Sequence, residues 1–207
     1  MANPISEIRR TDPVELFGLV LVGGRSARMR ADKASLIYHG IPQAEHCLKL
    51  LAPHCTQAFL SCRQDQSDQV GFQGFPQIHD AFLNMGPMSG ILSALRAHPG
   101  HAFLVVACDL PFLDAPTLSA LVRARNPDQL ATAFTGSQNG LPEPLCAIYE
   151  PASYPRMLEF LGKGITCPRK VLLNSPAHLL APPDLRALVN ANDPVAYQDA
   201  MKSLTSA

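Results

Sequence analysis

The stretch LFGLVLVGGRSARMRADK, residues 16–33, is the strongest indication of the fold class in this sequence. It joins an apolar run, residues 16–22, to a loop that opens with two glycines. A continuous apolar run of strand length is typical of a strand buried on both faces of a parallel sheet. Paired glycines after such a strand leave room for a ligand against the main chain. The stretch therefore predicts an α/β protein with a ligand at the end of its first strand.

The loop after this strand combines flexible backbone with positive charge. Successive N–H groups in a glycine turn can form an anion cradle. The residues that build this feature are Gly23, Gly24, Arg25, Arg28, Arg30 and Lys33, with Asp32 as the one acidic neighbour. The pattern indicates a diphosphate or triphosphate pocket, and the alternative is a solvated turn. It fits neither the Walker P-loop nor the G-x-G-x-x-G fingerprint, so another phosphate chemistry is needed.

Strand-like and helix-like segments alternate along the rest of the chain. Alternation of this kind predicts a three-layer α/β fold, with a mostly parallel central sheet and helices on both faces. We expect residues 1–15 to be a loose extension and residues 16–207 to form one domain. Strands are expected at 16–22, 58–62, 102–107, 130–134 and 145–149, and helices at 42–51, 88–95, after Asp114, and from Asp193-Pro194 to about Lys202.

Composition excludes several classes of protein. Of 207 residues, 47% are hydrophobic and 16% are charged, which is typical of a soluble globular protein rather than a disordered one. The zero net charge argues against a nucleic-acid binder. No apolar run approaches membrane-spanning length, and the first residues lack a signal-peptide core, so a cytoplasmic protein is expected. The six cysteines form no C-x-x-C pair, and most are expected in the core.

Asp109 ends the most apolar predicted strand, VVACD. Ligands of open α/β sheets gather at the carboxyl ends of strands. Mg²⁺ is usually held by one or two carboxylates plus substrate phosphates. Asp109 could instead cap a helix, but Asp114 already occupies the capping position of the next one. Asp109 is therefore the candidate metal ligand.

Two further features are expected at the same edge. His79-Asp80 precedes Gly86-Pro87 and Gly90, which again place flexible backbone before a helix. Asn190 and Asn192 precede the final helix, where their amides could bind a base, a sugar hydroxyl or a metal-bound water. Turn-forming asparagines are the alternative.

These motifs together resemble the molybdenum cofactor guanylyltransferases. The family opens with Leu-Ala-Gly-Gly, Arg-Met-Gly and Asp-Lys, where this chain has Val22 in place of Ala and Arg30 in place of Gly. Ser61 stands where the family often has Asn. The matching residues are Leu21, Gly23, Gly24, Arg28, Met29, Asp32, Lys33, Asp80, Gly86-Pro87, Gly90, Cys108-Asp109, Pro111, Pro144-Leu145, Tyr149, Asn190, Asn192 and Pro194.

The resemblance implies a nucleotide-diphospho-sugar transferase fold and a role for each matched residue. Lys33, Arg28 and Asp109 would be catalytic, and Asp109 would also bind Mg²⁺ as cofactor. Asn190 and Asn192 would bind the acceptor or contact the ligands of the metal. The nucleotide-binding set would be Leu21, Val22, Gly23, Gly24, Lys33, Ser61, Asp80 and Asp109.

The implied reaction transfers GMP from GTP to molybdopterin and releases pyrophosphate. Partners would be these substrates, with other cofactor-biosynthesis proteins or a molybdoenzyme, and neither nucleic acid nor membrane. Two alternatives stay open. One is a related transferase with another base or acceptor, such as a molybdopterin cytidylyltransferase or a sugar-phosphate nucleotidylyltransferase. The other is a non-catalytic nucleotide-binding module.

Overall fold

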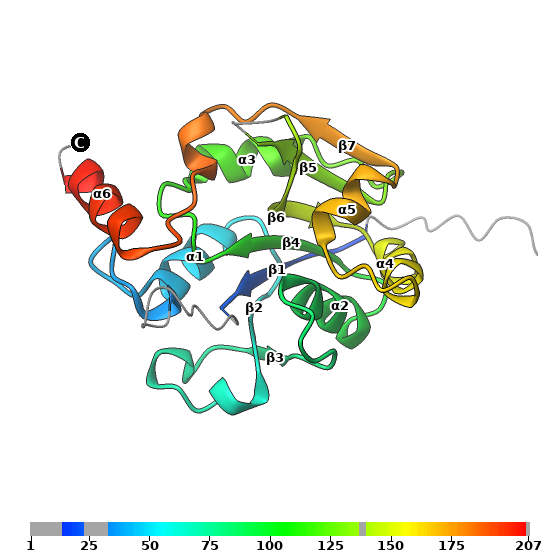
Figure 1. Cartoon of the computed structure of the whole chain (residues 1–207), viewed down its shortest axis with the longest axis horizontal. Helices are drawn as coiled ribbons and strands as arrows, with labels where there is room; N and C mark the ends of the chain where they lie inside the picture. Colours follow the sequence, from blue (N-terminus) through cyan, green and yellow to red (C-terminus); the bar gives the residue numbers. More distant parts are fainter. Residues whose placement is uncertain (1–13, 23–32, 137–139, 206–207) are drawn as a thin grey trace, which may run out of the picture.

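A seven-stranded mixed sheet forms the centre of the protein (Figure 1). The computed structural model describes residues 14–22, 33–136 and 140–205. The sheet order is β3-β2-β1-β4-β6-β5-β7. The strands are β1 (Leu16–Leu21), β2 (Ala58–Cys62), β3 (Gln77–His79), β4 (Ala102–Ala107), β5 (Ala131–Thr135), β6 (Pro142–Tyr149) and β7 (Ala177–Leu180).

Strand β6 runs against its two neighbours, while the other pairs in the sheet are parallel. Its register with β4 pairs Phe103 with Tyr149 and Val106 with Cys146. Because β6 is reversed, its first residues lie at the edge where β4 ends. The sheet is therefore mostly parallel, as expected, and one reversed strand brings its amino end to the carboxyl edge.

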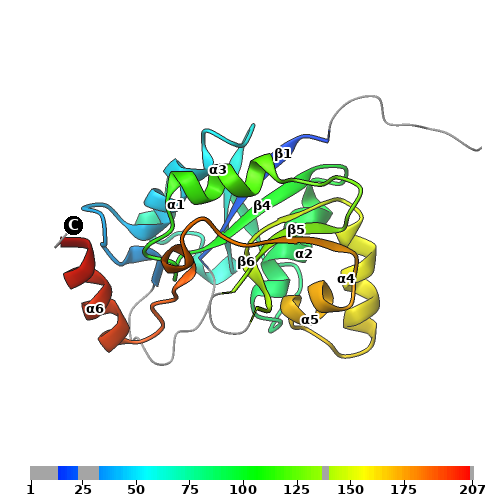
Figure 2. The same cartoon turned by 90° about the horizontal axis from the view of Figure 1, so that it is seen from above.

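Helices cover both faces of the sheet and make three layers (Figure 2). Helices α1 and α3 lie on one face, and α2, α4 and α5 lie on the other. Helix α6 stands apart from both layers, beside the loop that leaves β4 (Figure 1). The helices are α1 (Gln43–Leu51), α2 (Pro87–Ala97), α3 (Ala115–Arg123), α4 (Ser153–Gly162), α5 (Pro168–Leu173) and α6 (Pro194–Thr205). Short 3-10 helices span Lys33–Ser35, Gln64–Gln66, Val70–Phe72 and Leu185–Leu188.

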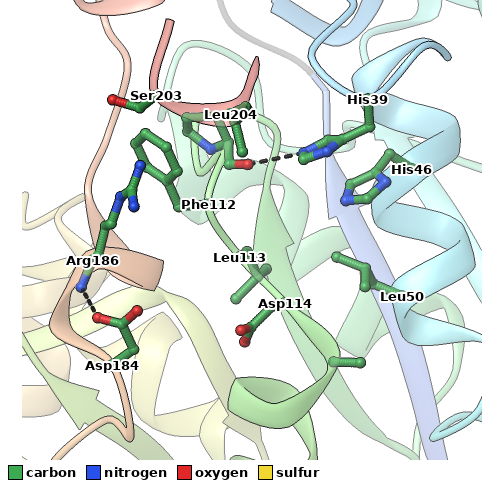
Figure 3. A pocket seen from close by; sticks show the side chains of 12 residues that line it. His39, His46, Leu50, Phe112, Leu113, Asp114, Asp184, Arg186, Ser203 and Leu204 are labelled. Atoms are coloured by element: carbon green, nitrogen blue, oxygen red, sulfur yellow. Dashed lines mark hydrogen bonds between the residues drawn. The ribbon is translucent and has the colours of Figure 1, made fainter. Parts of the chain in front are cut away.

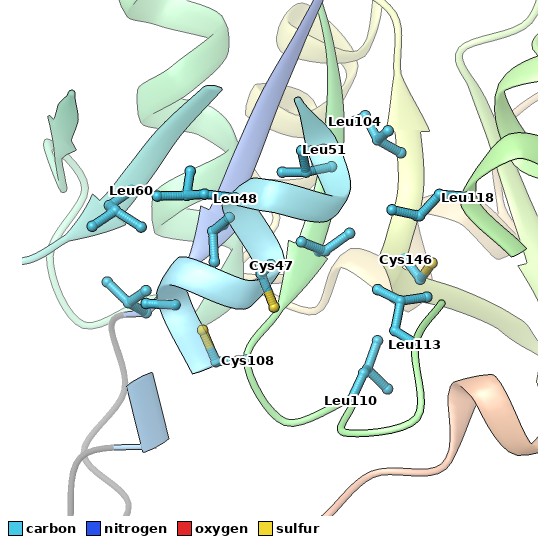
Figure 4. Packing of buried hydrophobic residues seen from close by; sticks show 14 of the residues in the cluster. Cys47, Leu48, Leu51, Leu60, Leu104, Cys108, Leu110, Leu113, Leu118 and Cys146 are labelled. Carbon is cyan, nitrogen blue, oxygen red and sulfur yellow. The ribbon is translucent and has the colours of Figure 1, made fainter. Parts of the chain in front are cut away.

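Each face of the sheet has its own apolar core. Figure 4 shows the α1 and α3 side, where Leu48 and Leu51 of α1 meet Leu104 of the sheet and Leu118 of α3. Four of the expected core cysteines are buried: Cys47, Cys62, Cys108 and Cys146. Cys167 is exposed. No helix in the described ranges is long and apolar enough to cross a bilayer.

The elements expected from the apolar patterns are confirmed within two or three residues at most ends. Asp114 caps α3, accepting a hydrogen bond from the Thr117 amide at 2.9 Å. Strand β3 and helices α4 and α5 have no counterpart among the expected elements, and neither does β7. β3 has three residues, α5 has six, and β7 has only four partly exposed residues. Short elements of this kind carry too few apolar positions for a period to show.

Candidate nucleotide and metal site

Four parallel strands end side by side at one edge of the sheet. Leu21 closes β1, and the amide of Val22 donates to the Ser61 carbonyl at 3.1 Å. The amide of Asp80 donates to the Cys62 carbonyl at 3.0 Å. Asp109 follows β4. The sheet order therefore places Asp80, Ser61, Leu21 and Asp109 in a row along this edge.

Asp80 lies in a small group of hydroxyls at one end of this row. The Ser61 hydroxyl donates to its Oδ1 at 3.4 Å. The Ser89 hydroxyl, which donates to the Phe82 carbonyl, also interacts with this carboxylate. Burial raises the pKa of Asp80, while these two hydroxyls and Arg63 oppose the rise. The Ser61 hydroxyl therefore donates its hydrogen bond to Asp80 within the protein. Ser61 and Asp80, which the sequence assigns to the nucleotide, form one hydrogen-bonded unit.

Helix α2 approaches this unit at Gly90. A Cβ at this position would lie 2.7 Å from Leu21 Cδ2 and still closer to the Ser61 hydroxyl. Only a glycine lets the helix pack this closely against the ends of β1 and β2. Gly86 precedes the helix with a φ of 57°, a conformation that favours glycine. The Gly-Pro-Met-Ser-Gly segment therefore serves close packing beside the site.

Glu143 is a second carboxylate near Asp109 that sequence reasoning missed. Because β6 runs antiparallel to β4, its first residues lie at the edge of the sheet where Asp109 follows β4. The Glu143 side chain is only 9% exposed, and burial raises its pKa, with the negative charge of Asp109 adding to the rise. The signal available in the sequence was Pro142-Glu143-Pro144, a charged residue opening an otherwise apolar strand.

Arg169 from α5 pairs with this carboxylate. Its Nη2 lies 3.3 Å from Glu143 Oε2, and its Nε donates to the Pro142 carbonyl at 3.0 Å. The Leu145 amide donates to Glu143 Oε1 at 3.1 Å. These partners offset part of the cost of burying a charge. The edge of the sheet next to Asp109 therefore carries an ion pair in which Arg169 balances the charge of Glu143.

The Asn190–Asn192 loop is also brought to Asp109. The amide of Ala191, between the two exposed asparagines, donates to the Asp109 carbonyl at 2.8 Å. Both asparagines therefore flank a residue bonded to the metal candidate, and their predicted roles stay predictions. Ala191 packs with Tyr38, a residue that sequence reasoning passed over and that is 5% exposed.

Several expected site residues fall outside the described part of the chain. These are Gly23, Gly24 and Arg28, together with Arg25, Arg30, Met29 and Asp32. Lys33 opens the 3-10 helix Lys33–Ser35, and its side chain is likewise outside the description. The phosphate-pocket prediction for these residues stays a prediction.

A separate cavity of about 320 Å³ lies against the loop that follows Asp109 (Figure 3). The stacked rings of His39 and His46, with centroids 3.9 Å apart, form one wall. His39 Nε2 lies 2.9 Å from the Pro111 carbonyl oxygen. Across the cavity, the Arg186 guanidinium lies 4.4 Å from the centroid of the Phe112 ring. The cavity therefore lies between α1, the 3-10 helix Leu185–Leu188 and the loop that carries Asp109.

Comparison with known proteins agrees with this arrangement. A family model described as the MobA-like NTP transferase domain matches residues 18–179. A molybdenum cofactor biosynthesis bifunctional protein from Synechocystis sp. is 37% identical over 182 residues, which cover 88% of this chain. The chain spans about half of that relative, 52% of its length. A molybdenum cofactor guanylyltransferase from Serratia proteamaculans is 28% identical, covering 77% of this chain and 78% of the relative.

Solved structures share the fold. The molybdopterin-guanine dinucleotide biosynthesis protein A from Archaeoglobus fulgidus superposes with a TM-score of 0.77 at 22% identity, covering 92% of this chain and 100% of that one. A 4-diphosphocytidyl-2C-methyl-D-erythritol synthase from Anaerococcus prevotii gives 0.66 at 11% identity, covering 94% and 100%. The expected nucleotidyltransferase architecture is confirmed.

Proposed function

Since the chain belongs to the MobA-like NTP transferases, a family of nucleotidyltransferase enzymes, we propose that it transfers GMP from GTP to molybdopterin. The relatives named as molybdenum cofactor guanylyltransferases support this choice of substrates. The observation that carries the proposal is the row of Asp80, Ser61, Leu21 and Asp109 along one edge of the sheet. A nucleotide laid along this row would have its base near Asp80 and its phosphates near Asp109.

The proposed divalent cation is Mg²⁺, and Asp109 is the residue that would hold it. A carboxylate is the hard oxygen ligand that Mg²⁺ prefers, and Asp109 brings a carboxylate to the end of β4. When bound, the cation supplies positive charge that stabilises negative charge developing on phosphate oxygens. Asn190 and Asn192, held at Asp109 through Ala191, are the proposed acceptor or metal-water contacts.

The proposed reaction asks the protein for positioning and electrostatics rather than covalent chemistry. An oxygen of the molybdopterin terminal phosphate attacks the α-phosphorus of GTP, and the bond from the α-phosphorus to the bridging oxygen breaks. Pyrophosphate leaves with that oxygen. Lys33 and Arg28 are proposed to stabilise the leaving pyrophosphate, together with the amides of Gly23 and Gly24.

The acceptor is proposed to bind beside Asp109, where β6 is the next strand along the edge. An in-line attack needs the acceptor on the far side of the α-phosphate from the leaving group. The Glu143–Arg169 pair and the Asn190–Asn192 loop are the groups near Asp109 that are proposed to contact the acceptor.

The base is tested by turnover with GTP, CTP, UTP and ATP, each with molybdopterin and with common sugar phosphates as acceptor. We expect GTP with molybdopterin to be preferred, by about ten- to two-hundred-fold over CTP for one set of base hydrogen bonds. Equal use of CTP and GTP would favour the cytidylyltransferase alternative. Nucleotide binding without any transfer would favour the binding module.

Substitution of Lys33 tests whether the protein is an enzyme or a non-catalytic nucleotide-binding module. Lys33→Ala is expected to lower kcat by raising the activation barrier about 2–4 kcal/mol, as for loss of one preorganised donor to developing charge. Arg28→Ala should be milder, because Arg25 or Arg30 can take over part of its charge. Steady-state kinetics of both variants beside the wild type give the answer. A Lys33→Ala protein with weaker GTP binding and unchanged kcat would make Lys33 an anchor only.

A further inference from the structure

Tyr38 carries a buried hydroxyl at the edge of the proposed site. The residue is 5% exposed, and its hydroxyl has no hydrogen-bond partner among the residues that the structure describes. Buried hydroxyls in native proteins are almost always hydrogen-bonded to protein or to water. An orphaned one is costly, so a partner outside the described residues is the physical expectation, and a bound ligand at the neighbouring site is one such partner.

The surroundings of Tyr38 hold its ring in one place. The Tyr197 ring packs against it, with centroids 5.0 Å apart and planes 60° apart. The Tyr197 hydroxyl donates to the Ile37 carbonyl at 3.3 Å, which ties α6 to the residue before Tyr38. Ala191 and Ala200 complete the cluster. The ring cannot readily turn away to find another partner for its hydroxyl.

The same cluster is joined to Asp109. Ala191 packs with Tyr38, and its amide donates to the Asp109 carbonyl. Burial raises the pKa of Tyr38 to about 12, and the negative charges of Tyr197, Asp109 and Cys108 add to the rise. The phenol therefore stays protonated at physiological pH and can act there as a hydrogen-bond donor beside Asp109.

We infer that the Tyr38 hydroxyl is a further ligand-binding group of the transfer site, which donates a hydrogen bond to an oxygen of the nucleotide–cation complex held at Asp109. The inference rests on the proposed function and adds a residue to it. The bound oxygen belongs either to a nucleotide phosphate or to a water on the cation. Both are acceptors of the same kind, and a protonated phenol serves either.

The test uses Tyr38→Phe, which removes one oxygen and keeps the ring. In the free protein we expect an unchanged or higher Tm, because the variant deletes an unsatisfied buried hydroxyl. Affinity for GTP with Mg²⁺, measured by calorimetry, should fall about ten-fold, the effect of losing one hydrogen bond to a charged acceptor. A side chain that only packs the core would leave this affinity unchanged.

Tyr197→Phe is the matched control. It removes a hydroxyl from the other ring of the same pair, but that hydroxyl donates to the Ile37 carbonyl. We expect a lower Tm, because a hydrogen bond is lost, and an affinity for GTP with Mg²⁺ within two-fold of the wild type. Opposite patterns in the two variants separate ligand binding from ring packing.

Titration with and without Mg²⁺ identifies the oxygen. A loss in Tyr38→Phe that persists for GTP in EDTA assigns the hydrogen bond to a phosphate oxygen. A loss seen only with Mg²⁺ assigns it to a water on the cation. Wild-type affinity in both conditions overturns the inference and leaves the proposed function intact. A wild-type chain that binds no nucleoside triphosphate in either condition overturns the proposed function first, and this inference with it.

Discussion

Asp109 stands where three separate parts of the chain meet. Strand β4 leads into it, Glu143 at the start of β6 lies close enough for the two charges to interact, and the Ala191 amide donates to its carbonyl. Only the first of these relations is local in sequence. The residue identity and the strand before it are enough to propose a metal ligand, while the neighbours that shape its charge come from positions more than thirty residues away.

Asp109→Asn tests the metal role. Asparagine has nearly the same shape but no charge, so we expect turnover to fall by about a hundred-fold or more, as for loss of a major electrostatic group. The free energy of unfolding should change little. Asp114→Ala is the control: it removes the cap of α3 and should cost about 1 kcal/mol of stability while turnover persists. Near-normal Mg²⁺-dependent turnover in Asp109→Asn would contradict the assignment.

His46 makes stability depend on pH. Burial lowers its pKa to about 4, and the charges of His39 and Lys49 add to the fall. Since the pKa in the folded state lies below the ordinary 6.5, the stabilising contribution is present above about pH 6.5. It is lost as the pH falls from about 6.5 through about 4, because the unfolded chain binds a proton on His46 at a higher pH than the folded protein does.

His46→Phe keeps an aromatic ring against His39 and removes the titration. Urea unfolding at pH values between about 7 and 4 should show a shallower loss of stability in this variant than in the wild type. Parallel stability curves for the two proteins would assign the acid sensitivity to other groups.

Among the elements, α2 is the one whose packing decides the geometry of the site. It meets the ends of β1 and β2 at Gly90, and its Ser89 reaches Asp80. The loop before it shares hydrogen bonds with the helix, since the Ala81 amide donates to the Ser93 hydroxyl at 2.8 Å. A shift of this helix would therefore move Ser61 and Asp80 together.

Gly90→Ala should reverse the usual effect of this substitution in a helix. Alanine is normally favoured over glycine by about 1 kcal/mol in a helix interior. Here the added methyl would collide with Leu21 and Ser61, so we expect a loss of about 1–3 kcal/mol and weaker nucleotide binding. Gly162→Ala in α4 is the control, because nothing lies within 4 Å of its added Cβ, and it should be neutral or stabilising. Chemical denaturation of both variants makes the comparison.

Across the whole molecule, the polar cluster at the edge of the sheet opposite the proposed site has a structural role. At the edge opposite the site, Arg125 donates to both carboxylate oxygens of Glu150, at 2.7 and 2.9 Å. A third bond, to the Val14 carbonyl at 2.9 Å, ties the pair to the chain just before β1. The side chains are 15% and 2% exposed. This buried, fully bonded cluster joins α3, β6 and the segment before β1.

Arg125→Met should therefore destabilise the protein without changing its chemistry. It leaves the Glu150 carboxylate buried and unpaired, which costs about 3–5 kcal/mol. The double variant Arg125→Met with Glu150→Leu should recover much of that loss, because no charge then remains buried. Urea unfolding measures the stabilities. Turnover below the melting temperature should match the wild type in both variants, and a selective fall in kcat would show that the two edges are coupled.

Local sequence patterns were enough to predict the fold class and to propose candidate residues for the site. Long apolar runs predicted β1, β2 and β4, and a carboxylate directly after an apolar strand pointed to Asp109. The strand predictions are confirmed because they depend on local patterns, while the metal-binding role of Asp109 stays a prediction that rests on the rule that carboxyl ends of parallel strands share an edge. The loop residues Gly23, Gly24 and Arg28 and the Lys33 side chain, by contrast, still rest on the sequence alone.

The neighbours of Asp109 become known from the folded structure alone. The reversal of β6 brings Glu143 to the same edge of the sheet, and the apolar pattern of a strand does not reveal its direction. Tyr38 sits in an ordinary mixed segment, and its burial under Tyr197 depends on where α6 docks, more than 150 residues later in the chain. The physical reason is the same in both cases: burial and charge at these positions arise from contacts between distant segments, which local sequence does not encode.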